Sequence, residues 1–516
     1  MKALFIYTLN NKYSTEMPIN NDWDIYFGIS MIYTVLKEHG HETDLLVLTH
    51  ESDISVLYNK IEDFKPDMIG FTSVASEYSY VKSLAGKVKE KYPSIYLVLG
   101  GVHATIFPSE KMLEIFDAIC IGEGEYPILE LLEQLAKRAT PPPEIKNLWV
   151  KQPDGTIKKN PVRDWIENLD ELPYIDREVW GKYIDKTNKN ITPSIVIGRG
   201  CPYLCTYCCN HALRKVANGK YTRYRSPQNI IGEIKTLHKY YENFDSIYFE
   251  VETFGADLKW SLEFCDALEA YNNSRADKLK FRINLRVTPS LLKNADHLLK
   301  RMADAGFNMI NIGLESGSER LRKDILHRNY SNEHIAQIIR LARKYNIESH
   351  LYVLIGLPTE TVEEYNMTVD FMKENNLTSY YLSIFYPYPG TDLYDFCVKN
   401  KFIPHESDSF QERINASINY PQFSKAKIQK AYFWFLFYIR KENESFDTLY
   451  AMMINVYQYF YSSKYKKKFI PLFVFLDAFL PTRQIRPHSG EKLFTLHFLC
   501  ECFRRYVIRL VKKINI

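Results

Sequence analysis

The order of strand-like and helix-like segments is the feature that most restricts how this chain can fold. Through residues 1–140, short runs rich in β-branched and aromatic residues alternate with segments of helical hydrophobic period. Such alternation usually gives parallel strands joined by right-handed crossovers. We therefore predict an α/β domain over residues 1–140, built on a doubly wound, Rossmann-like sheet. Its expected strands are Ala3–Tyr7, Thr43–Leu48, Met68–Thr72, Ile95–Leu99 and Ala118–Ile121.

Small residues follow three of these predicted strands. Ligands of doubly wound sheets bind beyond the carboxyl ends of the strands. A residue without a bulky side chain at that edge lets a ligand approach the backbone. We therefore expect a ligand beside Thr72-Ser73, Gly100-Gly101 and Gly122-Glu123-Gly124.

A second series of β/α units follows a connector over residues 141–192. The connector contains Pro141-Pro142-Pro143 and a predicted hairpin at Asp154-Gly155. Six parallel units over residues 193–395 predict a partial (β/α)6 barrel, whose chemistry lies at the carboxyl ends of its strands. The expected strands are Ile195–Ile197, Ser246–Phe249, Lys280–Leu285, Met309–Ile312, His350–Leu354 and Ser379–Phe385. Residues 396–516 show helical periods rich in aromatic residues.

Three cysteines lie close together just after the first strand of the predicted barrel. Cys201, Cys205 and Cys208 can bind one metal centre from a single loop. A structural zinc site needs four ligands, and Cys209 or His211 would have to complete it. The turn-like context argues against unligated core thiols. The spacing and placement favour an iron–sulfur cluster with one open iron.

At this point the sequence resembles the radical S-adenosylmethionine (SAM) superfamily. The family signature is C-x3-C-x2-C with an aromatic residue before the last cysteine. That residue is Tyr207 here, and the resemblance implies that it is one of the contacts with SAM. The likeness extends over about 200 residues, through Glu252–Phe254, Asn284–Arg286, Gly313–Ser318, Ile355–Pro358 and Tyr388–Thr391. It implies a [4Fe-4S] cluster on Cys201, Cys205 and Cys208, whose open iron chelates SAM. Reductive cleavage of SAM in this family gives a 5′-deoxyadenosyl radical.

The same resemblance implies several contacts with SAM. Glu252 would bind the SAM amino group, although the acidic residue usual before it is Val251 here, so that Glu250 is the alternative. Glu315 would contact the ribose or the carboxylate. A carboxylate at a strand end is otherwise a helix cap or an ion-pair partner.

Two further residues follow from the resemblance. Gly356 would lie near the adenine, and otherwise only forms a turn. Arg286 would neutralise the SAM carboxylate, or else pair with Glu315.

The N-terminal domain resembles the cobalamin-binding domain of the B12-dependent radical SAM subfamily. The likeness rests on a strand followed by G-G-x-H-x-T and a later G-E-G-E. It implies cobalamin contacts from Ser73, Gly100, Gly101 and Gly122. The D-x-H-x-x-G pattern that supplies an axial histidine elsewhere is missing, and we expect His103 to form hydrogen bonds in its loop rather than bind cobalt. The alternative is a degenerate Rossmann-like domain without a ligand.

Charge is unevenly distributed along the chain. The net charge of +4 is too small to indicate a nucleic-acid partner, and none is expected. This charge divides into +9 for residues 464–516 and −5 for the rest of the chain. An apolar helical face over Leu499–Ile514 carries basic residues beside it. Such a helix packs on a core or lies at a membrane surface, where a lipid-like substrate would be reached. Nine cysteines, no signal peptide and no run of ~20 apolar residues predict a cytoplasmic protein.

Taken together, the resemblances imply a cobalamin-dependent radical SAM enzyme, a methyltransferase acting on an unactivated carbon. A small-molecule or lipid-like substrate and a reductase, flavodoxin or ferredoxin as electron donor are expected. The alternative is a non-methylating B12 radical SAM enzyme such as an anaerobic-type oxidative cyclase. A hypothesis of another class is a non-catalytic cobalamin sensor with a vestigial barrel.

Overall fold

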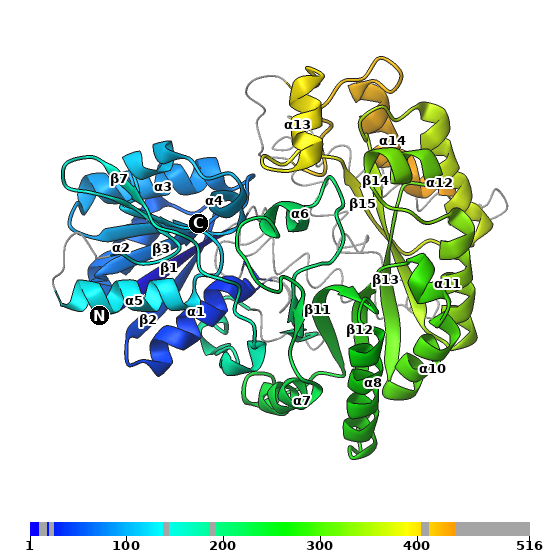
Figure 1. Cartoon of the computed structure of the whole chain (residues 1–516), viewed down its shortest axis with the longest axis horizontal. Helices are drawn as coiled ribbons and strands as arrows, with labels where there is room; N and C mark the ends of the chain where they lie inside the picture. The colour runs from blue at the N-terminus through cyan, green and yellow to red at the C-terminus, as the bar shows by residue number, and fades with distance from the viewer. Residues whose placement is uncertain (10–17, 20–24, 138–143, 185–190, 404–411, 440–516) are drawn as a thin grey trace, which may run out of the picture.

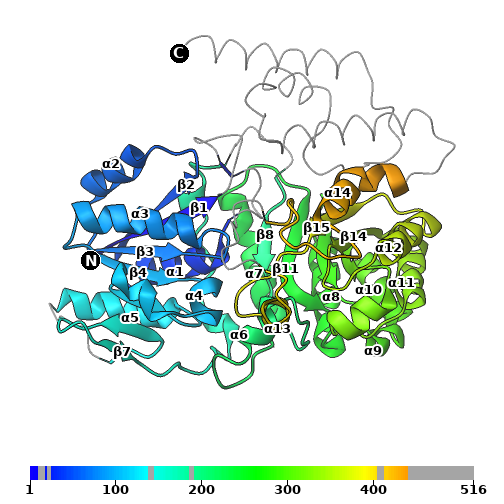
Figure 2. The same ribbon diagram turned by 90° about the horizontal axis from the view of Figure 1, so that it is seen from above.

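The structure is a computed structural model that describes residues 1–9, 18–19, 25–137, 144–184, 191–403 and 412–439. Two β/α units lie side by side in it, and the short helix α6 (Cys209–Leu213) lies between them (Figure 1). Figure 2, a view from above, also shows the two units next to each other. The sequence-based α/β fold class is confirmed.

The N-terminal unit is a doubly wound sheet with strand order β2-β1-β3-β4-β5-β6-β7. The first five strands are parallel, and the order reverses between β1 and β3. Its strands are β1 (Lys2–Leu9), β2 (Glu42–Thr49), β3 (Met68–Thr72), β4 (Tyr96–Gly100), β5 (Ala118–Cys120), β6 (Leu148–Lys151) and β7 (Ile157–Lys159). Its helices are α1 (Phe27–Glu38), α2 (Ile54–Phe64), α3 (Tyr78–Lys91), α4 (Val102–Ile106) and α5 (Glu125–Ala136).

Part of the predicted connector belongs to this sheet. The hairpin at Gly155 is present, and its strand β6 pairs antiparallel with β5 while β7 pairs with β6. The sheet therefore extends beyond residue 140, where the sequence places the end of the first domain.

Each face of the N-terminal sheet has its own core. Helices α2 and α3 pack on one face through residues such as Leu57 and Leu84. Helices α1 and α5 pack on the other through Ile29 and Leu132, in a cluster that continues into the barrel. The two β/α units therefore share one hydrophobic core, which restricts their relative movement.

The second unit is a six-stranded parallel sheet with order β15-β14-β13-β12-β11-β8. No pairing joins β15 to β8 among the described residues, so this barrel is partial. The strands are β8 (Ser194–Val196), β11 (Ser246–Phe254), β12 (Lys280–Leu285), β13 (Phe307–Glu315), β14 (Glu348–Ile355) and β15 (Tyr380–Ile384). The outer helices are α7 (Pro227–Thr236), α8 (Leu258–Asn273), α10 (Ala295–Ala305), α11 (Asn332–Lys344) and α12 (Val362–Glu374).

Local signals in the sequence fix where the outer helices begin and end. Ser331 and Thr361 start α11 and α12 with capping boxes, in which side chain and backbone satisfy each other's donors. Gly306 ends α10 in the left-handed conformation that glycine adopts at low cost. Because each helix ends at a defined residue, the chain can return into the next parallel strand. The carboxyl ends of the strands therefore lie together at one end of the barrel, which we call its mouth.

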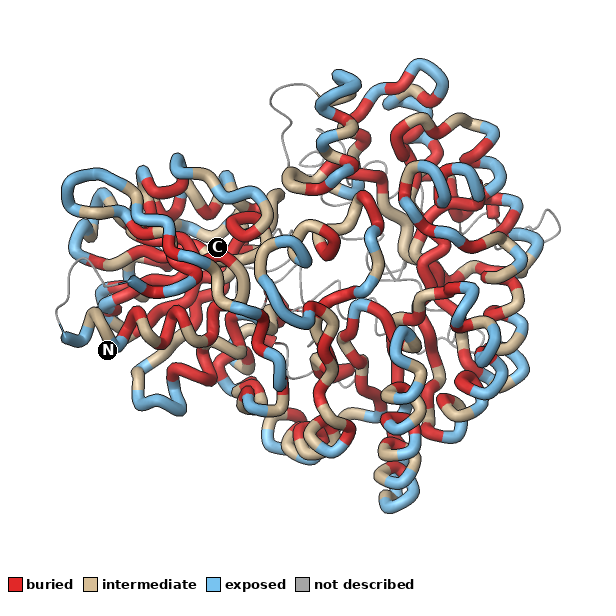
Figure 3. Tube along the Cα trace, viewed as in Figure 1, coloured by how far each residue is buried: buried red, intermediate tan, exposed pale blue. Residues whose placement is uncertain are grey.

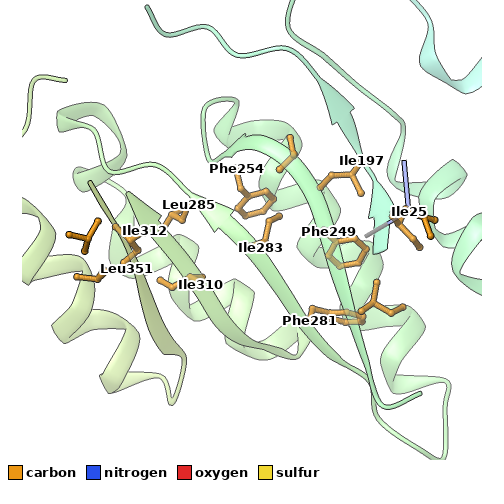
Figure 4. Close-up of a cluster of buried hydrophobic side chains, with 14 of the residues drawn as sticks. Ile25, Ile197, Phe249, Phe254, Phe281, Ile283, Leu285, Ile310, Ile312 and Leu351 are labelled. Carbon is orange, nitrogen blue, oxygen red and sulfur yellow. The ribbon is translucent and has the colours of Figure 1, made fainter. Parts of the chain in front are cut away.

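The barrel strands are buried on their outer face by aromatic and branched residues (Figure 3). Figure 4 shows part of this core, in which Phe249 and Phe281 have ring centroids 5.3 Å apart. Ile283, Ile310 and Ile312 continue the layer on the neighbouring strands, and none is exposed. This packing holds the strands in register and thereby positions the side chains at the mouth.

Two helices beyond the barrel belong to the predicted helical C-terminal region. Helix α13 (Asp392–Lys399) follows β15, and α14 (Lys425–Ile439) packs on β15, where Phe435 contacts Tyr380. In the described part of the chain, no helix has the length and apolar character needed to cross a bilayer. The predicted basic helix over Leu499–Ile514 lies outside the described residues.

Candidate functional site

The cysteine loop is held at the barrel mouth by contacts from both of its sides. It lies between the paired strands β9 (Gly198–Arg199) and β10 (Arg223–Tyr224). Thr206, in the middle of the loop, donates from its backbone N–H and its hydroxyl to the carbonyls of Leu326 and Ile325. Its own carbonyl accepts the N–H of Leu393 at 2.9 Å. The loop is therefore fastened to segments that leave β13 and β15.

The three cysteines of this loop have different surroundings. Cys201 and Cys205 are buried and Cys208 is half-buried. A hydrogen bond with Cys209 lowers the pKa of Cys208 to about 7, whereas burial raises the pKa of Cys201 to about 11. No three His, Cys, Asp or Glu side chains in the described ranges are arranged to hold a single metal ion.

Arg286 lies against the cysteine loop. Its guanidinium donates to Cys205 Sγ at 2.7 Å and lies 3.9 Å from the centre of the Tyr203 ring. The pairing of Arg286 with Glu315, one of the two sequence-based alternatives, is wrong. Arg286 comes from the end of β12, and its position leaves a cation beside the predicted cluster ligands.

Glu315 ends β13 and has another partner, Arg328. The carboxylate accepts a hydrogen bond from Arg328 at 2.6 Å, and both side chains are 7% exposed. Arg328 also donates to the Tyr207 hydroxyl at 2.8 Å. Two of the predicted SAM contacts, Tyr207 and Glu315, are thus brought together by a residue that the sequence analysis missed. Gly313 makes this possible, because a Cβ there would lie 2.4 Å from Glu315 Oε1.

Glu252 projects from β11 into the space between the two units. Its side chain is exposed to the cavity, but protein fills much of the space around it. This loss of surrounding water raises the pKa of its carboxyl group. Gly356 has a different environment: its N–H donates to Glu360 Oε2 at 2.5 Å, and its φ of 73° is that of a turn. The turn interpretation of Gly356 therefore fits the structure, with its amide already occupied.

At the edge of the N-terminal sheet, Gly101 brings two loops into close contact. Its φ is 95°, and a Cβ there would lie 2.6 Å from Thr72 Oγ1 and 2.7 Å from the Ser73 carbonyl. The hydroxyl of Thr105 donates to the Gly101 carbonyl at 2.9 Å and accepts the N–H of Gly122 at 3.1 Å. The hydroxyl of Ser73 is buried without a hydrogen-bond partner, so this edge holds an unused polar group.

His103 packs beside this edge among aromatic rings. Its ring centroid lies 4.7 Å from that of Tyr78 and 5.9 Å from that of Phe107, and its Nδ1 atom has no hydrogen-bond partner. Burial lowers the pKa of His103 to about 4. The side chain is therefore neutral at pH 7 and packs among aromatic rings, and its Nδ1 atom does not form the loop hydrogen bond that a loop role would need.

One cavity of about 520 Å³ joins the two units. Part of its wall is apolar and includes Met31 of α1, Ile128 of α5 and Gly70 of β3. The connector contributes Trp165, and the barrel mouth contributes Glu252 and Asn284. A ligand in this cavity would touch both the N-terminal sheet and the barrel.

The cavity collects some of the predicted residues and not others. Its described wall includes Gly100, Gly101, Gly122 and Glu252, and excludes Ser73, Tyr207, Arg286, Glu315 and Gly356. It also includes residues that the sequence analysis missed: Tyr26, Trp165, Arg199, Tyr221 and Arg223. The position of Arg199 between two glycines, just before the cysteine loop, was a signal that could have found it. Trp165 lies in the connector and has no comparable signal.

Comparison with known proteins gives a match for each unit. The model of the radical SAM superfamily matches residues 195–372, and the model of the B12-binding domain matches residues 25–132. An uncharacterised methyltransferase of Pyrococcus horikoshii is 26% identical over 389 residues, which cover 73% of this chain and 79% of that protein. The anaerobic magnesium-protoporphyrin IX monomethyl ester cyclase of Rubrivivax gelatinosus is 27% identical, covering 76% and 69%.

A similar fold occurs among solved structures. The radical SAM methyltransferase TsrM of Kitasatospora setae, solved with cobalamin and a [4Fe-4S] cluster, superposes with a TM-score of 0.61 at 16% identity. The superposition covers 77% of this chain and 78% of that one. At this identity, the likeness establishes the fold of both units and no more.

Proposed function

The chain combines a B12-binding domain with a radical SAM domain, and from this premise we propose that it is a cobalamin-dependent methyltransferase. Its acceptor would be an unactivated carbon of a small molecule. The observation that carries the proposal is the cavity shared by the two units, since Gly101 of the sheet edge and Glu252 of the barrel line the same space. Similarity to proteins named as methyltransferases supports the reaction class.

The edge of the N-terminal sheet fits cobalamin. Cobalamin is bulky and uncharged over most of its surface, and needs an apolar cleft with a few hydrogen-bonding groups. The part of the shared cavity lined by α1 and α5 is of that kind, and the unpartnered hydroxyl of Ser73 directly follows β3, whose last residue, Thr72, lines the cavity. We assign cobalamin contacts to Ser73, Gly100, Gly101 and Gly122. When bound, cobalamin supplies a transferable methyl group.

The barrel mouth fits a cluster and SAM. Cys201, Cys205 and Cys208 would hold a [4Fe-4S] cluster, because three thiolates leave one iron free for SAM. We assign SAM contacts to Tyr207, Glu252, Arg286 and Glu315, whereas the amide of Gly356, the other residue expected near SAM, is taken by Glu360. When bound, the cluster and SAM together supply the radical chemistry that removes a hydrogen atom from the substrate.

The side chains at the mouth provide binding, orientation and exclusion of water. The Glu315–Arg328 pair holds the Tyr207 hydroxyl through Arg328, which orients the cysteine loop. Arg286 would compensate the negative charge of the thiolates. Both units line the cavity, and together they would reduce the access of water to reactive groups, as radical chemistry requires.

A non-methylating reaction is the second candidate, favoured by the likeness to the magnesium-protoporphyrin cyclase. Product mass separates the two. Anaerobic protein reconstituted with iron, sulfide and hydroxocobalamin is given a reductant, SAM labelled in its methyl group, and extract of a strain lacking the gene. A carbon-bound labelled methyl group in a product supports the proposal. Deoxyadenosine without methylation would favour the cyclase-type reaction, and no SAM cleavage at all would favour a cobalamin sensor.

We also propose that a separate protein reduces the cluster and that the basic C-terminal region contacts a membrane surface. A flavodoxin, a ferredoxin or a reductase would deliver the electron to the cluster. Replacing the chemical reductant by each of these proteins in the same assay identifies which one supports SAM cleavage.

A further inference from the structure

Two arginines of the barrel and two glutamates of the N-terminal unit form a compact ion-pair network. Arg199 and Arg223 are register partners in the β9–β10 pair. Glu123 Oε1 lies 2.8 Å from Arg199 NH1 and 3.0 Å from Arg223 NH2. Glu125 Oε1 accepts a hydrogen bond from Arg199 NH2 at 2.7 Å. Each arginine is thus engaged by at least one carboxylate from the segment that links β5 to α5.

The connector completes this network. The second oxygen of Glu123 accepts the N–H of Ile166 at 2.8 Å and a hydrogen bond from Arg223 NH1 at 3.1 Å. Arg223 NH1 also donates to the Ile166 carbonyl at 2.6 Å. The side chains of Arg223 and Glu125 are 2% and 4% exposed. These are desolvated, charge-assisted contacts, unlike a pair of mobile surface charges.

The charge state of Glu123 follows from its surroundings. Burial acts to raise the pKa of this carboxyl group, but the charges of Arg199 and Arg223 outweigh burial and hold the pKa below its usual value. Glu123 is therefore ionised at neutral pH. Replacing it would leave the buried Arg223 without its carboxylate partner and Arg199 with Glu125 alone.

The place of this network links the two proposed cofactor sites. Arg199 precedes Cys201 by two residues, and Glu123 follows Gly122, a proposed cobalamin contact. All four charged residues line the shared cavity. A displacement of these four side chains would therefore move both the cysteine loop and the edge of the N-terminal sheet.

We propose that Glu123 is a positioning residue that sets the distance between the cysteine loop and the cobalamin edge, with Arg199 and Arg223 as its anchors. The inference rests on the proposed function, because it assumes that both cofactors are bound. Groups that react with each other must be held within about 1 Å of the productive geometry. The G-E-G-E segment thereby has a second role: its glycines border one cofactor site and its glutamates fix the other unit against it.

The test compares Glu123→Gln with a matched control, Glu130→Gln, in the full chain. Glu130 lies on α5 and forms a two-pronged pair with Arg163 at 3.1 Å for each oxygen, but this pair does not reach the cysteine loop. Both variants are loaded with cluster and cob(II)alamin, and iron and cobalamin contents are measured. Pulsed EPR then gives the distance distribution between the reduced cluster and cob(II)alamin.

We expect the distribution to shift and broaden in Glu123→Gln, and to match that of the wild type in Glu130→Gln. An unchanged distribution in loaded Glu123→Gln overturns the proposal. If that variant does not load, Arg199→Lys replaces it, since lysine keeps the charge but cannot bridge both glutamates, and an unchanged distribution in this variant also overturns the proposal. Wild-type protein that binds no cobalamin would contradict the proposed function itself.

A second measurement needs no cofactor. Hydrogen–deuterium exchange of the unloaded protein should increase in Glu123→Gln both at residues 121–125 and at residues 199–208, and in neither segment in Glu130→Gln. A rise confined to residues 121–125 would show a purely local role for Glu123, and would overturn its assignment as the link between the units.

Discussion

The two β/α units carry different free groups at their strand ends. The edge of the N-terminal sheet carries glycines and the neutral hydroxyl of Ser73, and its two carboxylates, Glu123 and Glu125, are already paired with arginines of the barrel. The barrel mouth carries further charged groups: Glu252 lines the shared cavity, and the Glu315–Arg328 pair lies outside the cavity wall. Both edges follow the same topological rule for ligand sites. The difference teaches that one edge is built to accommodate volume and the other to compensate charge.

This contrast matches the proposed ligands. A corrinoid needs space and a few hydrogen bonds, and the N-terminal edge obtains space where Gly101 replaces a side chain. A cluster with thiolate ligands and a zwitterionic cosubstrate need counter-charges, and the barrel provides Arg286 beside Cys205. Substitutions that fill space at the N-terminal edge, or that remove charge at the barrel mouth, therefore test this comparison directly.

The largest effect is expected for the cluster ligands. Replacing Cys201, Cys205 or Cys208 by Ala should remove the iron–sulfur absorbance, reduce bound iron to background and abolish SAM cleavage, because a missing thiolate leaves an iron unprotected. Cys209→Ala is the matched control from the same loop, and it should keep iron and absorbance. Cobalamin binding should survive in all four variants. Retention of the cluster in any of the first three would refute the ligand assignment.

The next effect belongs to the N-terminal edge. Gly101→Ala adds a Cβ that would lie 2.6 Å from Thr72 Oγ1, so the loop must move into the space proposed for cobalamin. We expect affinity for hydroxocobalamin to fall by roughly tenfold or more, equivalent to about 1.4 kcal/mol, with the cluster intact. Equilibrium dialysis and iron analysis measure the two quantities.

Gly155 provides the control for this substitution. It has a positive φ of 83°, comparable to the 95° of Gly101, but no atom within 4 Å of its added Cβ. Gly155→Ala should cost about 1 kcal/mol of stability and leave cobalamin affinity unchanged. An equal loss of affinity in both variants would mean that backbone strain, and not lost space, explains the effect at Gly101.

The barrel side of the comparison is tested by removing charge without changing shape. Glu315→Gln leaves Arg328 buried without its carboxylate and loosens the hold on Tyr207. We expect SAM affinity of the reconstituted protein to fall about tenfold, a cost of about 1.4 kcal/mol typical of a lost charge-assisted contact. Glu364→Gln is the matched control, since Glu364 pairs with Arg320 at 2.8 Å on helix α12. A comparable loss of SAM affinity in both variants would mean that Glu315 acts only through stability.

Local patterns made much of this architecture predictable. The strand and helix order, the loop with Cys201 and its neighbours, and the glycines at the sheet edge all depend on residues close in sequence. The partners of the charged groups were not predictable in the same way. Arg328 reaches Tyr207 across 121 positions, and Arg199 reaches Glu123 across 76. Such pairs are decided by the packing of whole units, which a single sequence does not display.

Arg286 illustrates the same limit within the site. The sequence indicated a cation at the end of a barrel strand, and offered Glu315 as one partner. In the folded chain, the strands place Arg328 next to Glu315 and leave Arg286 beside Cys205. The residue type was sufficient to predict the chemistry of the mouth. Only the register of neighbouring strands decides which charges meet.

The last prediction concerns stability rather than binding, at the titratable ring of His103 beside the N-terminal edge. Burial lowers the pKa of His103 to about 4, so the folded protein binds its proton less readily than the unfolded chain, whose ordinary value is 6.5. The resulting stability is present above pH 6.5 and is lost as pH falls from 6.5 towards 4. Between pH 7 and pH 5, the loss should be about 2 kcal/mol. Urea denaturation of cofactor-free protein at the two values measures it.

His103→Phe keeps a ring among Tyr78 and Phe107 but removes the titration, so its stability should fall less over the same interval. Exposed His238, on the outside of the barrel, supplies the control His238→Phe, which should behave as the wild type does. An undiminished pH dependence in His103→Phe would mean that this histidine is solvated or already charged in the folded protein. An unpaired charge would then lie at the N-terminal edge, in addition to the carboxylates that pair with Arg199 and Arg223, and volume alone would no longer distinguish this edge from the barrel mouth.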